Sequence, residues 1–301
     1  TEIKEEEIMK IILLTAVNAK YIHSNLAVYS LRAYAGALKE NIELAEYTIN
    51  NRTEYILREI YLKKPDVICF SCYIWNISII LEVAEEFHKL CPKVPIWVGG
   101  PEVSYEVEAF LQEHPFITGV IIGEGEKTFS ELCRYYVKGE SSLEEMKGIV
   151  LLDGAGNVQI HEPQEILDMN TIPFCYDLSE DFSHRIIYYE SSRGCPFRCS
   201  YCLSSVEKML RFRDVEIVKR ELQFFLDQKV KQVKFVDRTF NCDKKHAMAI
   251  WQYILEHDNG ITNFHFEIAA DLLTDEEADL IAKMRPGLIQ LEIGVQSTHD
   301  E

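Results

Sequence analysis

The sequence predicts an α/β protein whose first half is a doubly wound parallel sheet. At roughly 150 residues per domain, its 301 residues suggest about two domains. Short β-branched runs alternate with amphipathic stretches through the first 137 residues, which is the pattern of an open parallel sheet covered by helices. A content of 47% apolar and 27% charged residues is that of a globular chain, and it excludes collagen and disordered tails.

The elements expected in the first half follow from residue spacing. Apolar residues recur at helical spacing from Ile77 to Phe87, between two of the predicted strands. Residues 1–8 read as a charged leader, because Met9 and Lys10 would begin a chain naturally. We therefore expect the first domain to cover residues 9–137. The predicted strands are Ile11–Val17, Ile42–Tyr47, Val67–Ser71, Ile96–Gly99 and Val120–Ile122.

Two further regions follow the first domain. We expect a connector over residues 138–185, with a hairpin whose turn is Gly154–Asn157, and a second domain over residues 186–301. An amphipathic helix in that second domain is predicted to open at Arg211–Asp214 and to run to about Asp227. The strands expected beyond residue 137 are Ile149–Leu152, Val158–His161, Ile186–Ser191, Val233–Val236, Phe264–Ala269 and Leu288–Ile293.

Charge and cysteine content limit the function classes. The chain carries 31 Lys and Arg against 49 Asp and Glu, a net charge of −18 that repels nucleic-acid backbones and anionic membranes. Its longest apolar runs, such as Ile11–Val17, fall far short of the roughly 20 residues that cross a bilayer, and no secretory signal precedes them. Nine cysteines, an odd number, are expected to be reduced thiols or metal ligands in the cytoplasm.

Three loops at the carboxyl ends of predicted strands carry the candidate residues of a ligand site. In an open parallel sheet these ends share one edge, and ligands bind there. Glycines let a backbone approach a large planar ligand closely, while hydroxyls and helix amino-terminal amides bind its polar rim. Taken singly, Gly99-Gly100 also suits a plain turn and Trp75 also suits a core. The candidates are Ser71, Tyr73, Trp75 and Asn76, then Gly99, Gly100, Pro101 and Glu102, and finally Gly123, Glu124, Gly125 and Glu126.

Together these loops resemble the cobalamin-binding domain at the front of many radical S-adenosylmethionine (SAM) enzymes. In that family a Ser-containing loop, a Gly-Gly loop and a Gly-Glu-Gly-Glu loop surround the corrin ring. They match this chain at Ser71, at Gly99-Gly100 and at Gly123–Glu126. The resemblance implies a Rossmann-like fold and bound cobalamin.

One departure from other cobalamin proteins concerns the lower cobalt ligand. The motif Asp-x-His-x-x-Gly, which supplies a histidine to cobalt elsewhere, would need Asp at position 21 and Gly at position 26 around His23. This chain has Tyr21 and Leu26 there. We therefore expect His23 to be a loop histidine and cobalamin to be bound base-off, without a histidine ligand.

The strongest signal is a cysteine triplet. Cys195, Cys199 and Cys202 follow a predicted strand with the spacing Cys-x3-Cys-x2-Cys. Three thiolates can hold three irons of a 4Fe-4S cube and leave the fourth iron open to a small molecule. Structural zinc would need a fourth ligand at a defined spacing, and Cys242 lies forty residues further on. A disulfide does not suit the compartment, and we expect Cys175 to be an inert thiol.

This spacing, with an aromatic residue before the third cysteine, resembles the signature of the radical SAM superfamily, and the likeness continues to the end of the chain. It implies a partial (β/α)6 TIM-like barrel that is truncated at the carboxyl end, because four of six strands are present. It also implies SAM contacts from Tyr201, Asp237, Glu267 and Gln296. Asp237 could instead cap a helix, and Glu292 could be a satisfied barrel carboxylate.

The resemblance implies an anaerobic, cobalamin-dependent radical SAM enzyme that cleaves SAM to a 5′-deoxyadenosyl radical. We expect a methyltransferase acting on an unactivated carbon of a small-molecule substrate, supplied with electrons by a low-potential donor such as flavodoxin or ferredoxin. Two alternatives stay open. One is a cobalamin-assisted cyclisation or rearrangement without methyl transfer, and the other is a non-catalytic cobalamin sensor or carrier.

Overall fold

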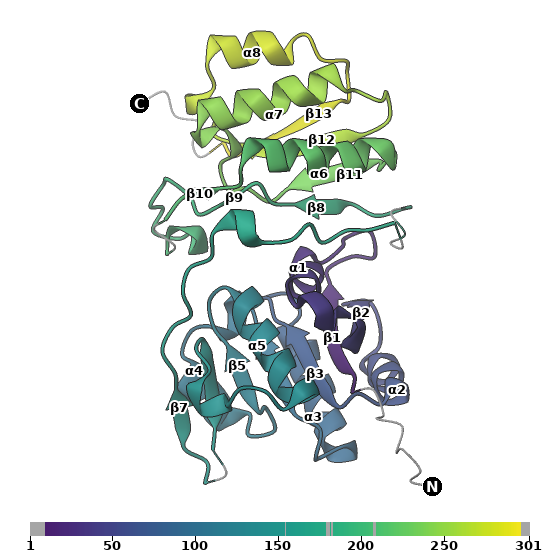
Figure 1. Cartoon of the computed structure of the whole chain (residues 1–301), viewed down its shortest axis with the longest axis vertical. Helices are drawn as coiled ribbons and strands as arrows, with labels where there is room; N and C mark the ends of the chain where they lie inside the picture. The colour runs from purple at the N-terminus through teal and green to yellow at the C-terminus, as the bar shows by residue number, and fades with distance from the viewer. Residues whose placement is uncertain (1–9, 154, 179–180, 182, 207–208, 296–301) are drawn as a thin grey trace, which may run out of the picture. The chain divides into compact units, whose positions relative to one another are not determined.

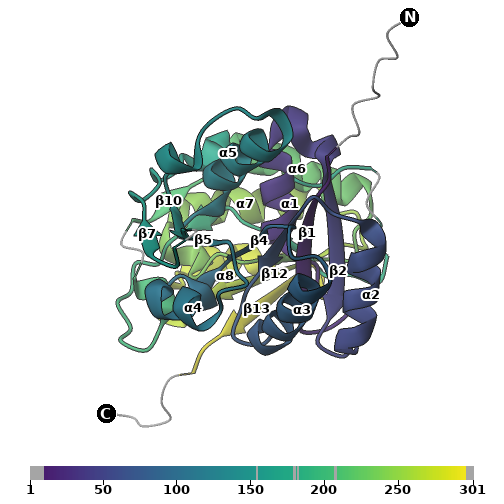
Figure 2. The same cartoon turned by 90° about the horizontal axis from the view of Figure 1, so that it is seen from below.

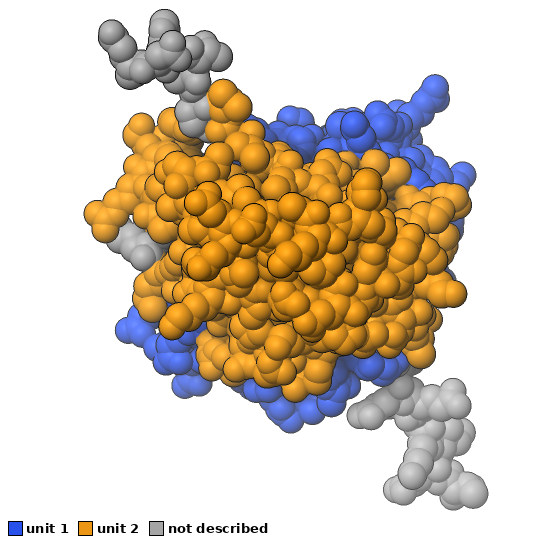
Figure 3. Space-filling model, turned by 90° about the horizontal axis from the view of Figure 1, so that it is seen from above, with its two compact units in different colours: residues 1–21, 27–167, 173–176 blue, residues 22–26, 168–172, 177–301 orange. Residues whose placement is uncertain are grey.

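The computed structural model describes residues 10–153, 155–178, 181, 183–206 and 209–295, in two compact units. Unit 1 comprises residues 1–21, 27–167 and 173–176, and unit 2 comprises residues 22–26, 168–172 and 177–301 (Figure 3). The two units therefore interleave along the chain. Two short segments of unit 2, residues 22–26 and 168–172, lie in sequence between segments of unit 1.

Unit 1 is built on a seven-stranded sheet in the order β2-β1-β3-β4-β5-β6-β7 (Figure 1). The first five strands are parallel, and the last two are antiparallel. The order reverses between β1 and β3, as in doubly wound sheets, which confirms the predicted fold class. The strands are β1 (Ile12–Asn18), β2 (Ile42–Thr48), β3 (Val67–Ser71), β4 (Ile96–Gly99), β5 (Gly119–Ile121), β6 (Ile149–Leu152) and β7 (Val158–Ile160).

Helices cover both faces of this sheet. Figure 2 shows α1 and α5 on one face and α2, α3 and α4 on the other. The predicted helical spacing recurs in α3, where Ile80, Val83, Ala84 and Phe87 are buried. Both faces of the sheet are apolar for this reason, and every residue of β1 is buried. The helices are α1 (Leu26–Tyr34), α2 (Thr53–Lys63), α3 (Ile77–Leu90), α4 (Val107–Glu113) and α5 (Gly125–Lys138).

The expected hairpin is present, and it extends the sheet of unit 1. β6 pairs antiparallel with β5, and β7 pairs with β6. In the turn, Oδ1 of Asp153 accepts hydrogen bonds from the backbone N–H groups of Ala155 and Asn157, at 2.8 Å each. An Asp that binds the backbone two residues on is a common turn device.

Unit 2 is an arc of four parallel strands in the order β13-β12-β11-β8, with a helix after each of β11 and β12 and a two-stranded ribbon between β8 and α6. This is the expected partial barrel. On one face of this sheet, Phe235 and Phe266 pack against each other and against Phe240 of the loop after β11. Phe240 and Phe266 also contact Trp251 of α7. The elements are β8 (Ile187–Tyr189), β9 (Ser192–Arg193), β10 (Arg211–Phe212), α6 (Val215–Asp227), β11 (Gln232–Phe235), α7 (Lys244–Glu256), β12 (Asn263–Ile268), α8 (Asp275–Ile281) and β13 (Ile289–Ile293).

The predicted start of α6 was wrong. Arg211 and Phe212 form β10, paired antiparallel with β9, and the helix begins at Val215. The reason is local, because the Asp214 side chain accepts a hydrogen bond from the backbone N–H of Glu216 at 2.8 Å. That contact is an N-cap, which places Asp214 outside the helix.

Arg213, between β10 and α6, is buried in an ion pair with Glu221. Its Nε lies 2.9 Å from Glu221 Oε2, and its guanidinium also donates to the carbonyl oxygens of Met169 at 2.6 Å and Ile172 at 2.8 Å. The Tyr189 hydroxyl donates to the same Glu221 oxygen at 2.6 Å. This pair therefore holds residues 168–172 in unit 2.

We predict that Glu221→Gln lowers the free energy of unfolding by about 3–5 kcal/mol, because it leaves the Arg213 charge buried without its counter-charge. Urea unfolding followed by circular dichroism measures it. The matched control is Glu216→Gln, whose Lys219 partner lies 2.8 Å away on the surface and whose loss should cost roughly 0–1 kcal/mol. Equal costs for the two variants would contradict the prediction.

Candidate functional site

The carboxyl edge of the unit 1 sheet brings together the loops after β3 and β4. In the parallel register Ser71 pairs with Gly99, and Gly99 pairs with Ile121. Gly100 has φ +118°, and a Cβ there would stand 2.4 Å from the Cys72 carbonyl oxygen. Only glycine fits this conformation and this close approach. Pro101 and Glu102 then open a short 3-10 helix over Pro101–Val103.

Asn76 shapes the loop after β3. Its side-chain amide donates to the carbonyl oxygens of Val17 and Ser71, at 3.0 Å each, and its Oδ1 accepts from the Tyr73 N–H at 2.7 Å. The side chain is fully buried. It therefore ties the ends of β1 and β3 together at the point where the strand order reverses.

The same loop presents aromatic surface. The Tyr73 and Trp75 rings stack with centroids 4.4 Å apart and planes 7° apart. Trp75 is 46% exposed and Ile74 is 78% exposed, so Trp75 does not belong to the core. An exposed, flat apolar platform at a sheet edge fits the face of a large planar ligand.

The loop after β5 leads into α5. Gly123 has φ +74° with open space where a Cβ would lie, and Gly125 is the first residue of the helix. Glu124 accepts a hydrogen bond from the Leu167 N–H at 3.1 Å. Glu126 is buried, and Ser30 Oγ of α1 donates to it at 3.2 Å. Both carboxylates therefore contact other segments of the chain at this edge.

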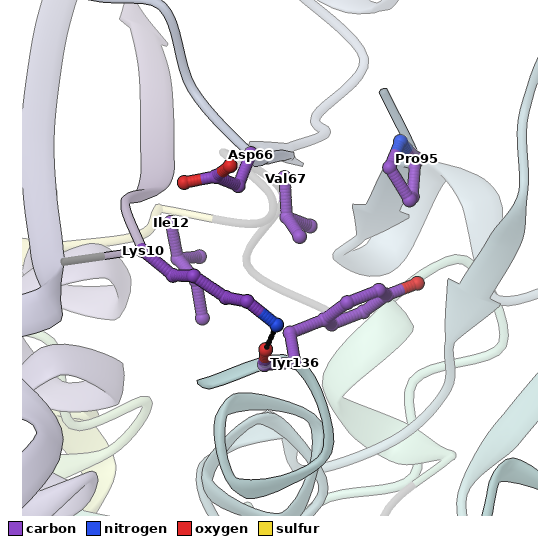
Figure 4. Close-up of a pocket in the computed structure, with 6 residues that line it drawn as sticks. All are labelled: Lys10, Ile12, Asp66, Val67, Pro95 and Tyr136. Carbon is purple, nitrogen blue, oxygen red and sulfur yellow. Dashed lines mark hydrogen bonds between the residues drawn. The ribbon is translucent and has the colours of Figure 1, made fainter. Parts of the chain in front are cut away.

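A pocket of about 200 Å³ lies at the opposite edge of this sheet (Figure 4). Lys10 at its rim donates a hydrogen bond to the Tyr136 carbonyl oxygen at 2.8 Å. The pocket is lined by residues at or just before the amino-terminal ends of β1, β3 and β4 and by Tyr136 of α5, so it lies away from the candidate loops. The lining residues are Lys10, Ile12, Asp66, Val67, Pro95 and Tyr136.

His23 lies in the segment 22–26, which belongs to unit 2. The segment follows β1 and forms a parallel bridge from His23 to Ile186, beside β8. Nδ1 of His23 shares a hydrogen bond with the Tyr188 hydroxyl, and the two rings stack with centroids 5.9 Å apart.

The cysteine triplet occupies the loop that leaves β9. Cys199 is exposed, Cys195 and Cys202 are half-buried, and all three are free thiols. In the part of the chain that the structure describes, no three His, Cys, Asp or Glu side chains converge as they would around a bound metal ion. The donor set nevertheless fits an iron–sulfur cluster, because three accessible thiols within eight residues are the ligands that such clusters take.

Asp237, after β11, fixes the base of this loop. It is 1% exposed, and it accepts hydrogen bonds from the Ser191 N–H at 3.0 Å and from the Ser191 and Ser192 hydroxyls at 2.6 Å each. Burial raises the pKa of the Asp237 carboxyl, and these hydrogen bonds oppose the rise. The N-cap of α7 is Asp243, so Asp237 caps no helix. Both carboxylate oxygens of Asp237 are occupied by the loop that leads to Cys195.

The polar face of the unit 2 sheet carries a charged network. Nζ of Lys234 on β11 lies 3.2 Å from Glu267 on β12 and 2.8 Å from Glu292 on β13. Burial lowers the pKa of Lys234, but the hydrogen bonds to both carboxylates outweigh it and raise that pKa. Nε2 of His265 lies 3.1 Å from Glu292. Glu267 and Glu292 therefore share one face with a cation between them.

The other two predicted SAM contacts are Tyr201 and Gln296. Tyr201, in the cysteine loop, is largely exposed, and Gln296 lies outside the described residues.

The sequence analysis did not single out Lys234 and His265, although the period-two alternation along β11 and β12 marks both as facing away from the helices. It also did not single out Ser191 and Ser192, for which no sequence signal existed.

Among the described residues, no helix is long and apolar enough to span a membrane.

Comparisons with known proteins identify both halves of the chain. Residues 12–133 match the B12 binding domain and residues 189–301 match the Radical SAM superfamily. An uncharacterised methyltransferase of Pyrococcus horikoshii is 32% identical over 200 residues, which cover 62% of this chain and 42% of that protein. The hopanoid C-3 methylase of Methylococcus capsulatus is 24% identical, over 87% of this chain and 51% of that protein. The anaerobic magnesium-protoporphyrin IX monomethyl ester cyclase of Rubrivivax gelatinosus is 23% identical, over 87% and 49%.

The fold is that of a solved enzyme. The cobalamin-dependent SAM radical enzyme OxsB, solved with aqua-cobalamin and SAM bound, superposes with a TM-score of 0.76 at 20% identity, over 96% of this chain and 44% of that one. This chain thus spans about half or less of the length of these relatives. Cobalamin, SAM and a 4Fe-4S cluster follow as cofactors from the two matched domains.

Proposed function

We propose, on the premise that this chain belongs to the radical SAM proteins with an amino-terminal B12 binding domain, that it methylates an unactivated carbon of a small-molecule substrate. The observation that carries the proposal is that one chain combines a glycine-rich carboxyl sheet edge with a three-cysteine loop. The relatives named methyltransferase and methylase support it.

When bound, the cluster and SAM would supply a radical that removes a hydrogen atom from the substrate, and cobalamin would supply the methyl group. We assign Cys195, Cys199 and Cys202 to the cluster. We assign the corrin to the sheet edge of unit 1, where Gly99 and Gly100 permit close approach and the Tyr73–Trp75 platform offers an apolar face. The other cobalamin contacts proposed here are Ser71, Asn76, Pro101, Glu102, Gly123, Glu124, Gly125 and Glu126.

For SAM, the proposed contacts are Tyr201, Glu267 and Gln296. Glu267 lies half-buried on the polar face of the unit 2 sheet, which suits a carboxylate that receives a ligand's ammonium group. The oxygens of Asp237 already accept three hydrogen bonds from Ser191 and Ser192. Asp237 stays a proposed SAM contact as well, because a carboxylate has about four acceptor positions, and through Ser191 and Ser192 it also holds the cysteine loop.

We further propose that cobalamin binds base-off, without a histidine ligand. The support is that His23 hydrogen-bonds and stacks with Tyr188 in unit 2. In addition, the Asp and Gly that flank a cobalt-binding histidine in the motif Asp-x-His-x-x-Gly are replaced by Tyr21 and Leu26 in this chain. A cytoplasmic location and a flavodoxin or ferredoxin as electron donor complete the proposal. None of the nine cysteines forms a disulfide, which suits a reducing compartment.

The cluster assignment predicts that Cys195→Ala loses most iron and sulfide after anaerobic reconstitution, because a cube held by three thiolates loses one corner. Colorimetric iron and sulfide assays per chain measure the loss. Cys175→Ala is the control and should load as the unaltered chain does. Equal iron in both variants would refute the assignment.

The reaction predicts two products from SAM after reduction of the reconstituted protein with its substrate. Radical cleavage yields 5′-deoxyadenosine, and methyl transfer yields S-adenosylhomocysteine, both measurable by mass spectrometry. The relative named as a cyclase favours one alternative, cyclisation, which yields 5′-deoxyadenosine alone. A sensor or carrier yields neither product. Absence of S-adenosylhomocysteine would therefore reject the methyltransferase.

The base-off proposal predicts the electron paramagnetic resonance spectrum of the cob(II)alamin-loaded protein. With no nitrogen below cobalt, the signal should lack nitrogen superhyperfine splitting, and His23→Ala should leave it unchanged. A splitting that disappears in His23→Ala would show that this histidine binds cobalt.

A further inference from the structure

The loop between β11 and α7, residues 236–243, lies against the cysteine loop and is itself rigidly held. At its start, the Val236 N–H donates to the Tyr189 carbonyl oxygen at 2.9 Å, and Asp237 accepts from Ser191 and Ser192. At its end, the Asn241 amide donates to the Ala269 carbonyl oxygen at 2.9 Å and its Oδ1 accepts from the Ala269 N–H at 3.0 Å. The loop thus joins the carboxyl ends of β8, β11 and β12.

Thr239 stands at the centre of this loop and contacts a cysteine of the triplet. Its hydroxyl oxygen lies 3.5 Å from Sγ of Cys195, within hydrogen-bonding distance for sulfur. The side chain is 6% exposed. The Thr239 carbonyl accepts from the Cys242 N–H at 3.1 Å, which fixes its backbone. The contact is therefore made by a buried hydroxyl on a braced backbone.

The direction of this hydrogen bond follows from the chemistry of a cluster ligand. A cysteine that binds iron is a thiolate, which accepts hydrogen bonds and has none to donate. The Thr239 hydroxyl must then be the donor. Hydrogen bonds to cluster sulfurs help to set the reduction potential, and a donor stabilises the more negative, reduced cluster more strongly than the oxidised one.

We propose that Thr239 is a positioning residue that donates a hydrogen bond to Sγ of Cys195 and raises the reduction potential of the cluster. The inference rests on the proposed assignment of Cys195 as a cluster ligand. It makes the threonine a determinant of how readily an electron donor reduces the cluster, apart from any contact with SAM or substrate.

The test compares Thr239→Val, which keeps the side-chain shape and removes the hydroxyl, with the unaltered chain. Both are reconstituted anaerobically and titrated against redox mediators, with the reduced cluster followed by electron paramagnetic resonance. We expect equal iron and sulfide and a midpoint potential that shifts to a more negative value in Thr239→Val. Thr239→Ser, which restores a hydroxyl, should return the potential toward that of the unaltered chain.

Thr262→Val is the matched control, because Thr262 is a buried threonine just before β12, at the opposite end of that strand from Ala269. The midpoint potential of the cluster in Thr262→Val should equal that in the unaltered chain. An unchanged potential in Thr239→Val with full iron would overturn the inference and leave the cluster assignment intact. Failure of the unaltered chain to bind iron would instead reject the proposed function. If Thr239→Val binds too little iron for the titration, Thr239→Ala removes the same hydroxyl without adding a methyl group. The inference then requires the midpoint potential of Thr239→Ala to shift to a more negative value.

Discussion

Parallel strands send every connection back over a face of the sheet, so the loops that leave their carboxyl ends collect at one edge. Both units obey this constraint. In unit 1 it brings Ser71 beside Gly99, which lie 28 positions apart in the chain, through the register of β3 and β4. In unit 2 it brings Asp237 after β11 to Ser191 after β8. Without parallel pairing, neither set of residues would share a surface.

Buried side chains hold neighbouring strand ends together, in addition to the backbone hydrogen bonds of the sheets. Asn76 joins the ends of β1 and β3, Asp237 joins those of β8 and β11, and Asn241 joins those of β11 and β12. Each is a buried polar group whose hydrogen bonds are made within the protein, as burial demands. Strand ends fastened in this way would position the loops to which we assign the cofactors.

Much of the fold could be predicted because the spacing of apolar residues and the residue types of strands and turns are local properties of the sequence. The bounds predicted for β3, β4 and β6 match the structure, and those of the other predicted strands differ by one or two residues at one or both ends. Arg211 was misassigned because amphipathic spacing continues upstream of the helix, whereas the helix start depends on the Asp214 cap. The cysteine loop was recognisable from spacing alone. The contact between Thr239 and Cys195 was not, since 44 positions of chain separate them and only the folded register brings them together.

The interleaving of the units limits how the chain can be divided. Residues 168–172 accept hydrogen bonds from the buried Arg213, and the carbonyl of Ile22 accepts one from the N–H of Ile186 at 2.7 Å. A gene fragment that begins at residue 186 would therefore encode a barrel arc deprived of partners that lie upstream of its first codon. Chimaeras that graft another cobalamin-binding module onto this arc would have to carry those two short segments along. An evolutionary exchange of residues 186–301 as one contiguous module would leave the same two segments behind.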